Sequence, residues 1–210
     1  MRRAQPAALT ARAGRWNHNI HYYPVLLDAV PEGCERALDV GCGEGVLARA
    51  LQRCVPQVSG IDLDEPTVER ARRASATLGI DYLVGDFQTY PFDPASFDFV
   101  VSAAALHHMM DAATALRRMS ELLRPGGTLA VLGLARSQYP ADLPRDFAAA
   151  VANRALRVTR QNWESSAPTV WPPPETYATM RRLAEQTLPQ VRFRRHLLWR
   201  YSLIWTKATH

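Results

Sequence analysis

The fold is decided by the stretch ALDVGCGEGVL, residues 37–47 of a chain of 210. The apolar residues before the first glycine predict a short buried strand, and the spacing after the last glycine is typical of a helix. Glycines between the two allow a tight turn and a close approach to a ligand, because no Cβ intrudes. The helix start offers unpaired N–H groups to that ligand. We therefore expect a ligand loop at the carboxyl end of a strand.

Further buried strands and helical patterns alternate along the chain after this loop. We expect strands over 36–40, 57–61, 80–84, 97–102 and 128–132. We expect helices over 45–53, 66–78 and 111–123, and a turn over 124–127. Such alternation favours an α/β fold with a doubly wound, mostly parallel sheet. Residues 191–207 alternate like two strands that meet near Trp199, which predicts a C-terminal antiparallel hairpin.

The two remaining regions flank the expected sheet. Residues 1–35 read as an N-terminal tail and a cap helix, with Pro24 in the first turn of that helix and a stop at 31–33. Residues 36–210 form the main domain. Within it, the proline-containing part over 135–174 has no regular pattern. We interpret 135–175 as a lid on the substrate side, followed by a helix over 175–188.

Composition limits the class of protein. The net charge is +5, but the arginines are scattered and Lys207 is the only lysine, so we do not expect a nucleic-acid partner. No stretch approaches the ~20 apolar residues of a membrane span, and no membrane partner is expected. Three cysteines without metal-finger spacing favour reduced thiols and a cytoplasmic protein.

The loop fits one class of nucleotide-like ligand better than the others. A dinucleotide fingerprint that starts at Gly41 would end on glycine or alanine where Val46 stands, and no Walker Gly-Lys-Ser/Thr follows. The run Asp39–Gly45 resembles motif I of class I S-adenosylmethionine (SAM)-dependent methyltransferases, acidic-x-Gly-x-Gly-x-Gly. The resemblance continues in order through 61–64, 85–87, 97–102 and 122–129, and covers 36–133.

This resemblance implies a Rossmann-like sheet of seven strands that binds SAM and releases S-adenosylhomocysteine. Asp62 would accept hydrogen bonds from both ribose hydroxyls, Asp86 would accept the adenine amino group, and Phe87 would pack on the adenine ring. In this family the N-terminal helix often covers the cofactor. The residues expected to bind the cofactor are Asp39, Gly41, Cys42, Gly43, Gly45, Asp62, Leu63, Asp86, Phe87, Ala103, Tyr22 and His18.

Methyl transfer from SAM is an in-line displacement, so alignment is the protein's main task. His107 and His108 follow the fourth strand and are the candidate bases, although either could instead bond structurally or contact SAM. His21, Tyr23 and Trp171 are the candidate substrate-binding residues. For the N-terminal residues the alternative is an ordinary amphipathic cap that packs on the core.

The acceptor is less defined than the cofactor. Ser-Ala-Ala-Ala at 102–105 replaces the motif typical of amino methylation, and no Asp stands there as in metal-dependent catechol-type enzymes. We therefore expect no metal. The resemblance is to small bacterial enzymes of quinone and natural-product biosynthesis, which favours a small-molecule acceptor, with oxygen ahead of carbon or nitrogen. Alternatives are an RNA methyltransferase, a non-catalytic SAM-binding protein, or an enzyme that uses NAD or decarboxylated SAM. The oligomeric state is left open.

Overall fold

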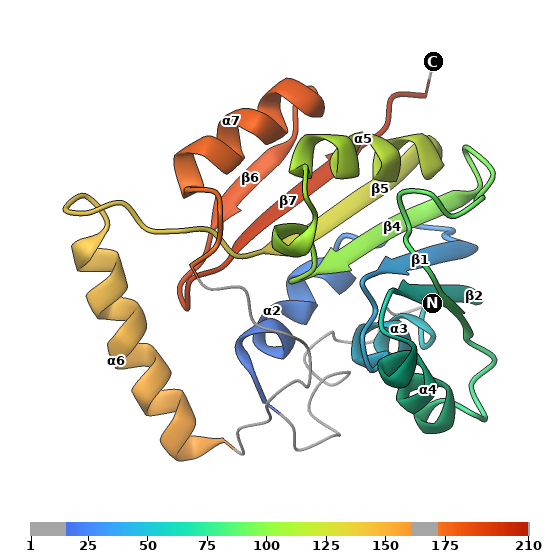
Figure 1. Cartoon of the computed structure of the whole chain (residues 1–210), viewed down its shortest axis with the longest axis horizontal. Helices are drawn as coiled ribbons and strands as arrows, with labels where there is room; N and C mark the ends of the chain where they lie inside the picture. The colour runs from blue at the N-terminus through green and yellow to red at the C-terminus, as the bar shows by residue number, and fades with distance from the viewer. Residues whose placement is uncertain (1–15, 161–171, 210) are drawn as a thin grey trace.

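A computed structural model describes residues 16–160 and 172–209. In these residues seven strands form one sheet in the order β3-β2-β1-β4-β5-β7-β6 (Figure 1). The first five strands are parallel, whereas β7 is antiparallel to both β5 and β6. This confirms the predicted Rossmann-like sheet and its C-terminal hairpin. The strands are β1 Arg36–Val40, β2 Gln57–Asp62, β3 Asp81–Val84, β4 Phe97–Ala103, β5 Leu123–Gly133, β6 Arg192–Arg195 and β7 Tyr201–Thr206.

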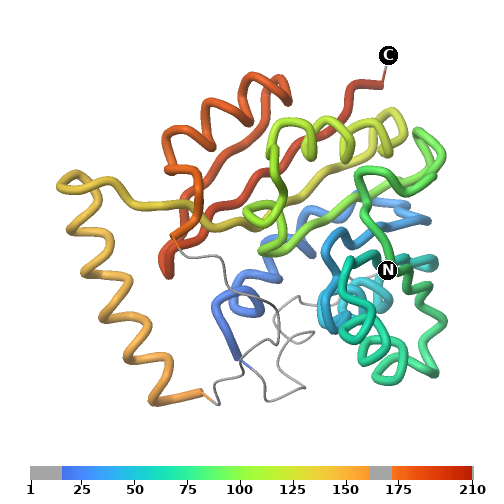
Figure 2. The backbone as a smooth tube through the Cα atoms, in the orientation of Figure 1, coloured from blue at the N-terminus to red at the C-terminus, as the bar shows by residue number. Residues whose placement is uncertain are grey.

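Helices cover both faces of this sheet and make it the middle of three layers. The helices are α2 His18–Leu27, α3 Val46–Leu51, α4 Glu65–Ala74, α5 Ala112–Leu122, α6 Leu143–Thr159 and α7 Tyr177–Thr187, with a short 3-10 helix, η2, at Leu106–His108. One buried cluster joins α5 and α7 to the sheet, and a second joins α2, α3 and α4 to it. The path of the chain shows β7 running between β5 and β6 (Figure 2).

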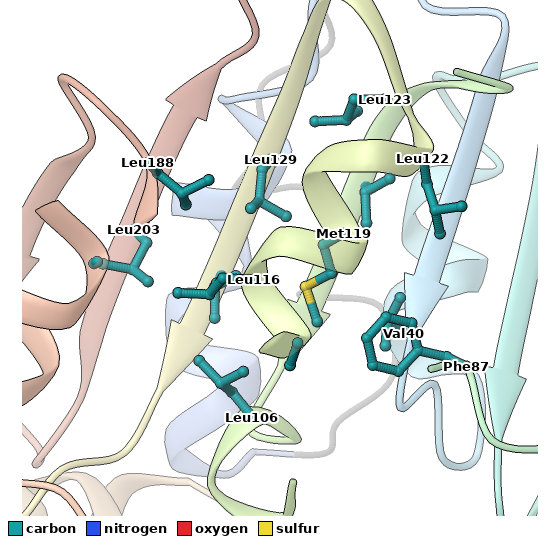
Figure 3. Close-up of a cluster of buried hydrophobic side chains, with 14 of the residues drawn as sticks. Val40, Phe87, Leu106, Leu116, Met119, Leu122, Leu123, Leu129, Leu188 and Leu203 are labelled. Atoms are coloured by element: carbon teal, nitrogen blue, oxygen red, sulfur yellow. The ribbon is translucent and has the colours of Figure 1, made fainter. Parts of the chain in front are cut away.

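The core on the α5 face follows from helical spacing. Leu116, Met119 and Leu122 of α5 are fully buried and point at the strands, where Leu129 and Val40 meet them (Figure 3). Each such side chain contributes about 1.5–3 kcal/mol when it is buried. This packing holds the carboxyl ends of β1 and β4 in place.

The N-terminal helix begins earlier than predicted. The side chain of Asn17 accepts hydrogen bonds from the N–H groups of Asn19 and Ile20, so α2 starts at His18. Pro24 therefore lies in the interior of the helix and not in its first turn, and the helix ends at Leu27, before 31–33. The correction places His18 and His21 on a helix.

The irregular region predicted over 135–174 contains a long helix, which corrects that prediction. α6 has 17 residues and Pro144 stands at its first turn, where a proline is tolerated. Its alanine-rich sequence has high helix propensity. An ion pair between Asp142 and Arg195 joins the start of α6 to β6.

The turn predicted over 124–127 lies inside β5. Leu123 pairs with Phe97 and Thr128 with Phe99, so four residues of β5 stand opposite a single residue of β4. The turn residues are thus an irregularity within one strand. Among the described residues, no helix has the length and apolar character needed to cross a membrane.

Candidate functional site

Three left-handed glycines shape the loop between β1 and α3. Gly41, Gly43 and Gly45 have φ angles of 70°, 51° and 70°, which other residues rarely adopt. A Cβ on Gly41 would stand 2.3 Å from the Cβ of Ala105, and one on Gly45 would stand 2.1 Å from the hydroxyl oxygen of Tyr82. The loop can therefore keep this path only with glycine at its two outer positions.

Hydrogen bonds tie this loop to the end of β2. The N–H groups of Gly41 and Cys42 donate to the carbonyl of Ile61, at 2.9 and 3.1 Å. Cys42 is buried. Ala103 is half-buried at the end of β4, the strand beside β1. The carboxyl ends of β1, β2 and β4 therefore meet at one edge of the sheet.

Asp62, the last residue of β2, holds its carboxylate against the glycine loop. The N–H of Gly43 donates to Oδ2 at 2.8 Å, and the N–H of Asp64 donates to Oδ1 at 3.1 Å. An ionised carboxylate accepts at about four lone-pair positions, so both oxygens keep the capacity to accept more. The side chain is thus oriented and can still accept two hydroxyl hydrogens.

Asp39 is a buried carboxyl group with an unused acceptor. It is 1% exposed, and its Oδ2 has no hydrogen-bond partner among the described residues. Burial, and then the charge of Asp62, raise its pKa to about 7. Tyr23 of α2 is also buried, and the charge of Asp39 adds to the effect of burial in raising the pKa of Tyr23. A donor group that reaches Oδ2 would satisfy it.

The edge formed by β2 and β3 carries the residues predicted to bind adenine. Leu63 directly follows Asp62 and is 71% exposed. Asp86 is exposed, and its Oδ1 accepts the N–H of Gln88 at 2.9 Å. Phe87 turns inward, is 5% exposed and lies beside Val40 (Figure 3). Among the described residues at this edge, Leu63 is therefore more exposed than the other open apolar side chain, Val84, and the predicted stacking of Phe87 stays a prediction.

His107 and His108 lie in η2, just after the end of β4. Their rings stand 4.0 Å apart between centroids. Burial, then His108 and Arg200, lower the pKa of His107 to about 4, and its Nδ1 is buried with no partner among the described residues. Burial also lowers the pKa of His108, against the opposing charge of Asp62. Both rings are accordingly neutral at pH 7.

The predicted residues of α2 face two directions. His18 shares a hydrogen bond of 2.8 Å between its Nε2 and Oδ1 of Asn153 in α6. Tyr22 donates its hydroxyl to the carbonyl of Leu197 at 2.8 Å, and the ring of His21 lies edge-on to that of Tyr22. His18 and Tyr22 therefore contact α6 and the β6–β7 turn, whereas Tyr23 faces the core. Their predicted ligand contacts stay predictions.

One predicted site residue lies outside the described residues, and one buried residue near the site was not predicted from the sequence. Trp171 lies outside the described residues, so its predicted contact with substrate stays a prediction. Arg200, one of the scattered arginines of the sequence, is 7% exposed and directly precedes β7. The signal that could have identified it is an arginine inside the otherwise apolar run from Leu197 to Tyr201.

The lowered histidine pKa values predict a pH-dependent stability. His107 and His196 have pKa values of about 4 in the folded protein, against 6.5 for a free histidine, with burial the largest cause for each. Between these pH values the two histidines bind more protons in the unfolded chain than in the folded protein. Their contribution to the free energy of unfolding is therefore complete above pH 6.5 and declines as the pH falls toward 4. We expect His107→Gln and His196→Gln to lose less stability across this window than the wild type does.

Urea unfolding at several pH values measures this difference. Asp39 also titrates in the window, but it is common to all three proteins and cancels in the comparison. Parallel curves for the wild type and both variants would show that neither histidine is held neutral by the fold.

As to metals, no group of three or more His, Cys, Asp or Glu within residues 16–160 and 172–209 is placed to hold a metal ion.

Comparisons with known proteins agree with this geometry. A family model described as a methyltransferase domain matches residues 38–131. An uncharacterised methyltransferase of Mycobacterium tuberculosis is 42% identical over 190 residues, covering 90% of this chain and 96% of the relative. A ubiquinone biosynthesis O-methyltransferase of Xanthomonas campestris is 39% identical, covering 61% of this chain and 54% of that protein.

A solved structure extends the agreement to the fold. A SAM-dependent methyltransferase of Aquifex aeolicus has a TM-score of 0.62 at 16% identity and covers 97% of this chain and 98% of that one. The relative from M. tuberculosis matches nearly from end to end, and the left-handed glycine loop lies where motif I of such enzymes is expected. The chain therefore belongs to the class I SAM-dependent methyltransferases, with SAM as its cofactor.

Proposed function

We propose that this enzyme transfers the methyl group of SAM to an oxygen of a small-molecule acceptor by in-line displacement, in the cytoplasm and in bacterial specialised metabolism. The observation that carries the proposal is the Asp62 carboxylate, which Gly43 and Asp64 hold in place at the end of β2. The preference for oxygen is supported by the Xanthomonas relative, which is named as an O-methyltransferase.

The residues at this edge fit SAM group by group. Asp62 would accept the two ribose hydroxyls, and the exposed side chain of Leu63 would pack on adenine beside Asp86. Oδ2 of Asp39 is a buried acceptor without a partner among the described residues, and such atoms are rare in folded proteins. The ammonium group of the methionine end of SAM would supply the missing donor.

The chemistry requires alignment more than activation. SAM supplies a methyl group that is already activated as a sulfonium. The chain must place the acceptor oxygen, the methyl carbon and the sulfur in line, and exclude water from the path. A hydroxyl acceptor must also lose a proton. His107 is a weak base because its pKa is about 4, so we assign proton removal to His108 and positioning to His107.

Two regions would enclose the acceptor. We assign residues 1–35 to a tail and cap helix, and 135–175 to a wall or lid on the substrate side of the domain formed by 36–210; residues 1–15 and 161–171 of these ranges lie outside the described residues. The bond between His18 and Asn153 joins α2 to α6, and the pairing of Asp142 with Arg195 joins α6 to β6. The described parts of both regions thus meet beside the carboxyl end of β5, where β7 begins.

The test has two stages. Calorimetric titration of the purified protein with S-adenosylhomocysteine, with NAD in parallel, establishes the cofactor: we expect binding of the first alone. SAM with a deuterated methyl group is then incubated with hydroxylated and carboxylated small molecules, and products are identified by mass spectrometry. Label on an oxygen supports the proposal. Label on carbon, on nitrogen or on added transfer RNA, with none on oxygen, would contradict it.

Comparing the turnover of two histidine variants tests which histidine is the base. His108→Ala should lower turnover with a hydroxyl acceptor more than His107→Ala does, and the loss should shrink as the pH is raised, because hydroxide then removes the proton. Affinity for S-adenosylhomocysteine should stay near the wild-type value in both variants. Equal turnover in the two variants would remove the base role from His108.

A further inference from the structure

Arg200 is a buried cation that pairs with no carboxylate among the described residues. Its Nε donates to Oδ1 of Asn19 at 2.8 Å, and its Nη1 donates to the carbonyls of Leu198 and Trp199 at 3.4 and 3.3 Å. All three acceptors are neutral. Nη2 makes no hydrogen bond with the described part of the chain. Arg195, by contrast, pairs with Asp142.

Among the described residues, no carboxylate offsets the charge of Arg200, and its charge acts on two neighbouring histidines. The pKa of His18 is lowered chiefly by burial and further by Arg200 and Arg157, and the pKa of His107 is lowered by burial, His108 and Arg200. Burial lowers the pKa of the Arg200 guanidinium to about 10, and only the tyrosines 22 and 177 oppose this effect. A buried charge is costly unless it is paired, and hydrogen bonds to neutral groups offset only part of the cost.

The position of Arg200 separates it from the cofactor loop. The next residue, Tyr201, pairs with Gly133 at the carboxyl end of β5. β5 and β4 stand between β7 and β1 in the sheet. At about 4.8 Å per strand, Arg200 lies roughly 14 Å along the sheet from the strand that carries the glycine loop. Arg200 lies at the same edge of the sheet as the two histidines that follow the carboxyl end of β4.

We propose that Arg200 binds a carboxylate of the methyl acceptor, so that the enzyme selects acidic small molecules. The inference rests on the proposed transfer to a small-molecule acceptor. The guanidinium would bind through Nη2, and neutral His18 and the ring of Trp199, 6.0 Å apart between centroids, would lie beside the bound acid. The same chemistry could come from the methionine carboxylate of SAM, and the test separates the two sources.

The test titrates the protein, loaded with S-adenosylhomocysteine, with benzoate, phenylacetate and 3-phenylpropionate, each against its primary amide. We expect the wild type to bind at least one acid about tenfold or more tightly than its amide, since a hydrogen bond to a charged group contributes about 1.5–3 kcal/mol. Arg200→Gln should remove this preference, and Arg200→Lys should retain part of it. Affinity for S-adenosylhomocysteine should change less than about twofold, because the cofactor makes no use of Arg200.

Controls distinguish binding from a structural role. Arg194→Gln removes an exposed arginine of β6 and should preserve the preference for acids. Asn19→Ala removes a neutral partner of Arg200 but keeps the charge, so the preference should persist. If Arg200→Gln does not fold, Arg200→Lys and Asn19→Ala carry the test.

Three outcomes would overturn the inference. These are equal affinity for acids and amides in the wild type, an unchanged preference in Arg200→Gln, or weaker binding of S-adenosylhomocysteine by Arg200→Gln. The last result would assign the charge to the cofactor. Failure of the proposed function shows differently, as no binding of S-adenosylhomocysteine by the wild type or no methyl transfer to any small molecule.

Discussion

Replacing Gly45 by alanine is expected to lower the free energy of unfolding by about 2–5 kcal/mol. Two causes add. The residue has φ of 70°, and left-handed backbone costs a non-glycine residue about 1–2 kcal/mol. The new Cβ would also stand 2.1 Å from the Tyr82 hydroxyl oxygen and 2.7 Å from its Cζ, inside a packed core. Chemical denaturation followed by circular dichroism measures the loss.

Gly43→Ala is the matched control. Gly43 is also left-handed, with φ of 51°, but the nearest atom to its Cβ position is Cγ2 of Thr67 at 4.0 Å. Only the backbone cost of about 1–2 kcal/mol applies there. Equal losses in Gly43→Ala and Gly45→Ala would show that Tyr82 moves aside and that space does not require glycine at position 45.

Asp62→Ala is expected to weaken binding of S-adenosylhomocysteine by about 10- to 150-fold. The substitution removes the carboxylate that would accept both ribose hydroxyls. It also removes the acceptor of the Gly43 N–H, so the loop loses a bond that holds it in shape. Calorimetric titration gives the affinity, and the fold should persist because Asp62 is only half-buried.

Asp64→Ala provides the comparison two residues away. The Asp64 side chain accepts the N–H of Thr67 and caps α4, so its loss should cost about 1 kcal/mol of stability. It should leave affinity for the cofactor near the wild-type value. Unchanged affinity in Asp62→Ala, or equal losses in the two variants, would contradict the assignment of Asp62 to the ribose.

The sheet could be predicted because its signals are local. A buried parallel strand is an apolar run, and the first two runs end at Val40, before a glycine, and at the carboxylate Asp62, so these strand ends are marked in the sequence itself. α6 escaped prediction because Pro140 and Pro144 suggested irregular chain, although a proline in the first turn is compatible with a helix. The start of α2 depends on the capping bonds of Asn17, which the apolar pattern does not report.

The residues of the candidate site also fall into two groups, those that the sequence indicates and those that only the fold brings together. The glycine loop and Asp62 lie together in an ordered motif, so the sequence indicates them and their spacing. Arg200 lies far along the chain from His18 and His107, and only folding brings it beside them. Its burial, and the absence of a carboxylate partner among the described residues, depend on the tertiary structure. A composition that counts arginines cannot separate this one from those in solvent.

The position of β7 has a consequence for the newly made chain. The ribosome delivers β7 after every strand that it joins, so until then the outer edge of β5 remains a row of unpaired N–H and C=O groups open to other chains. The glycine loop and Asp62 are made long before this point, whereas Arg200 emerges only with β7. The nascent protein thus completes its cofactor half first. The step that closes the sheet against aggregation is the same step that delivers Arg200, the residue proposed to bind the acceptor.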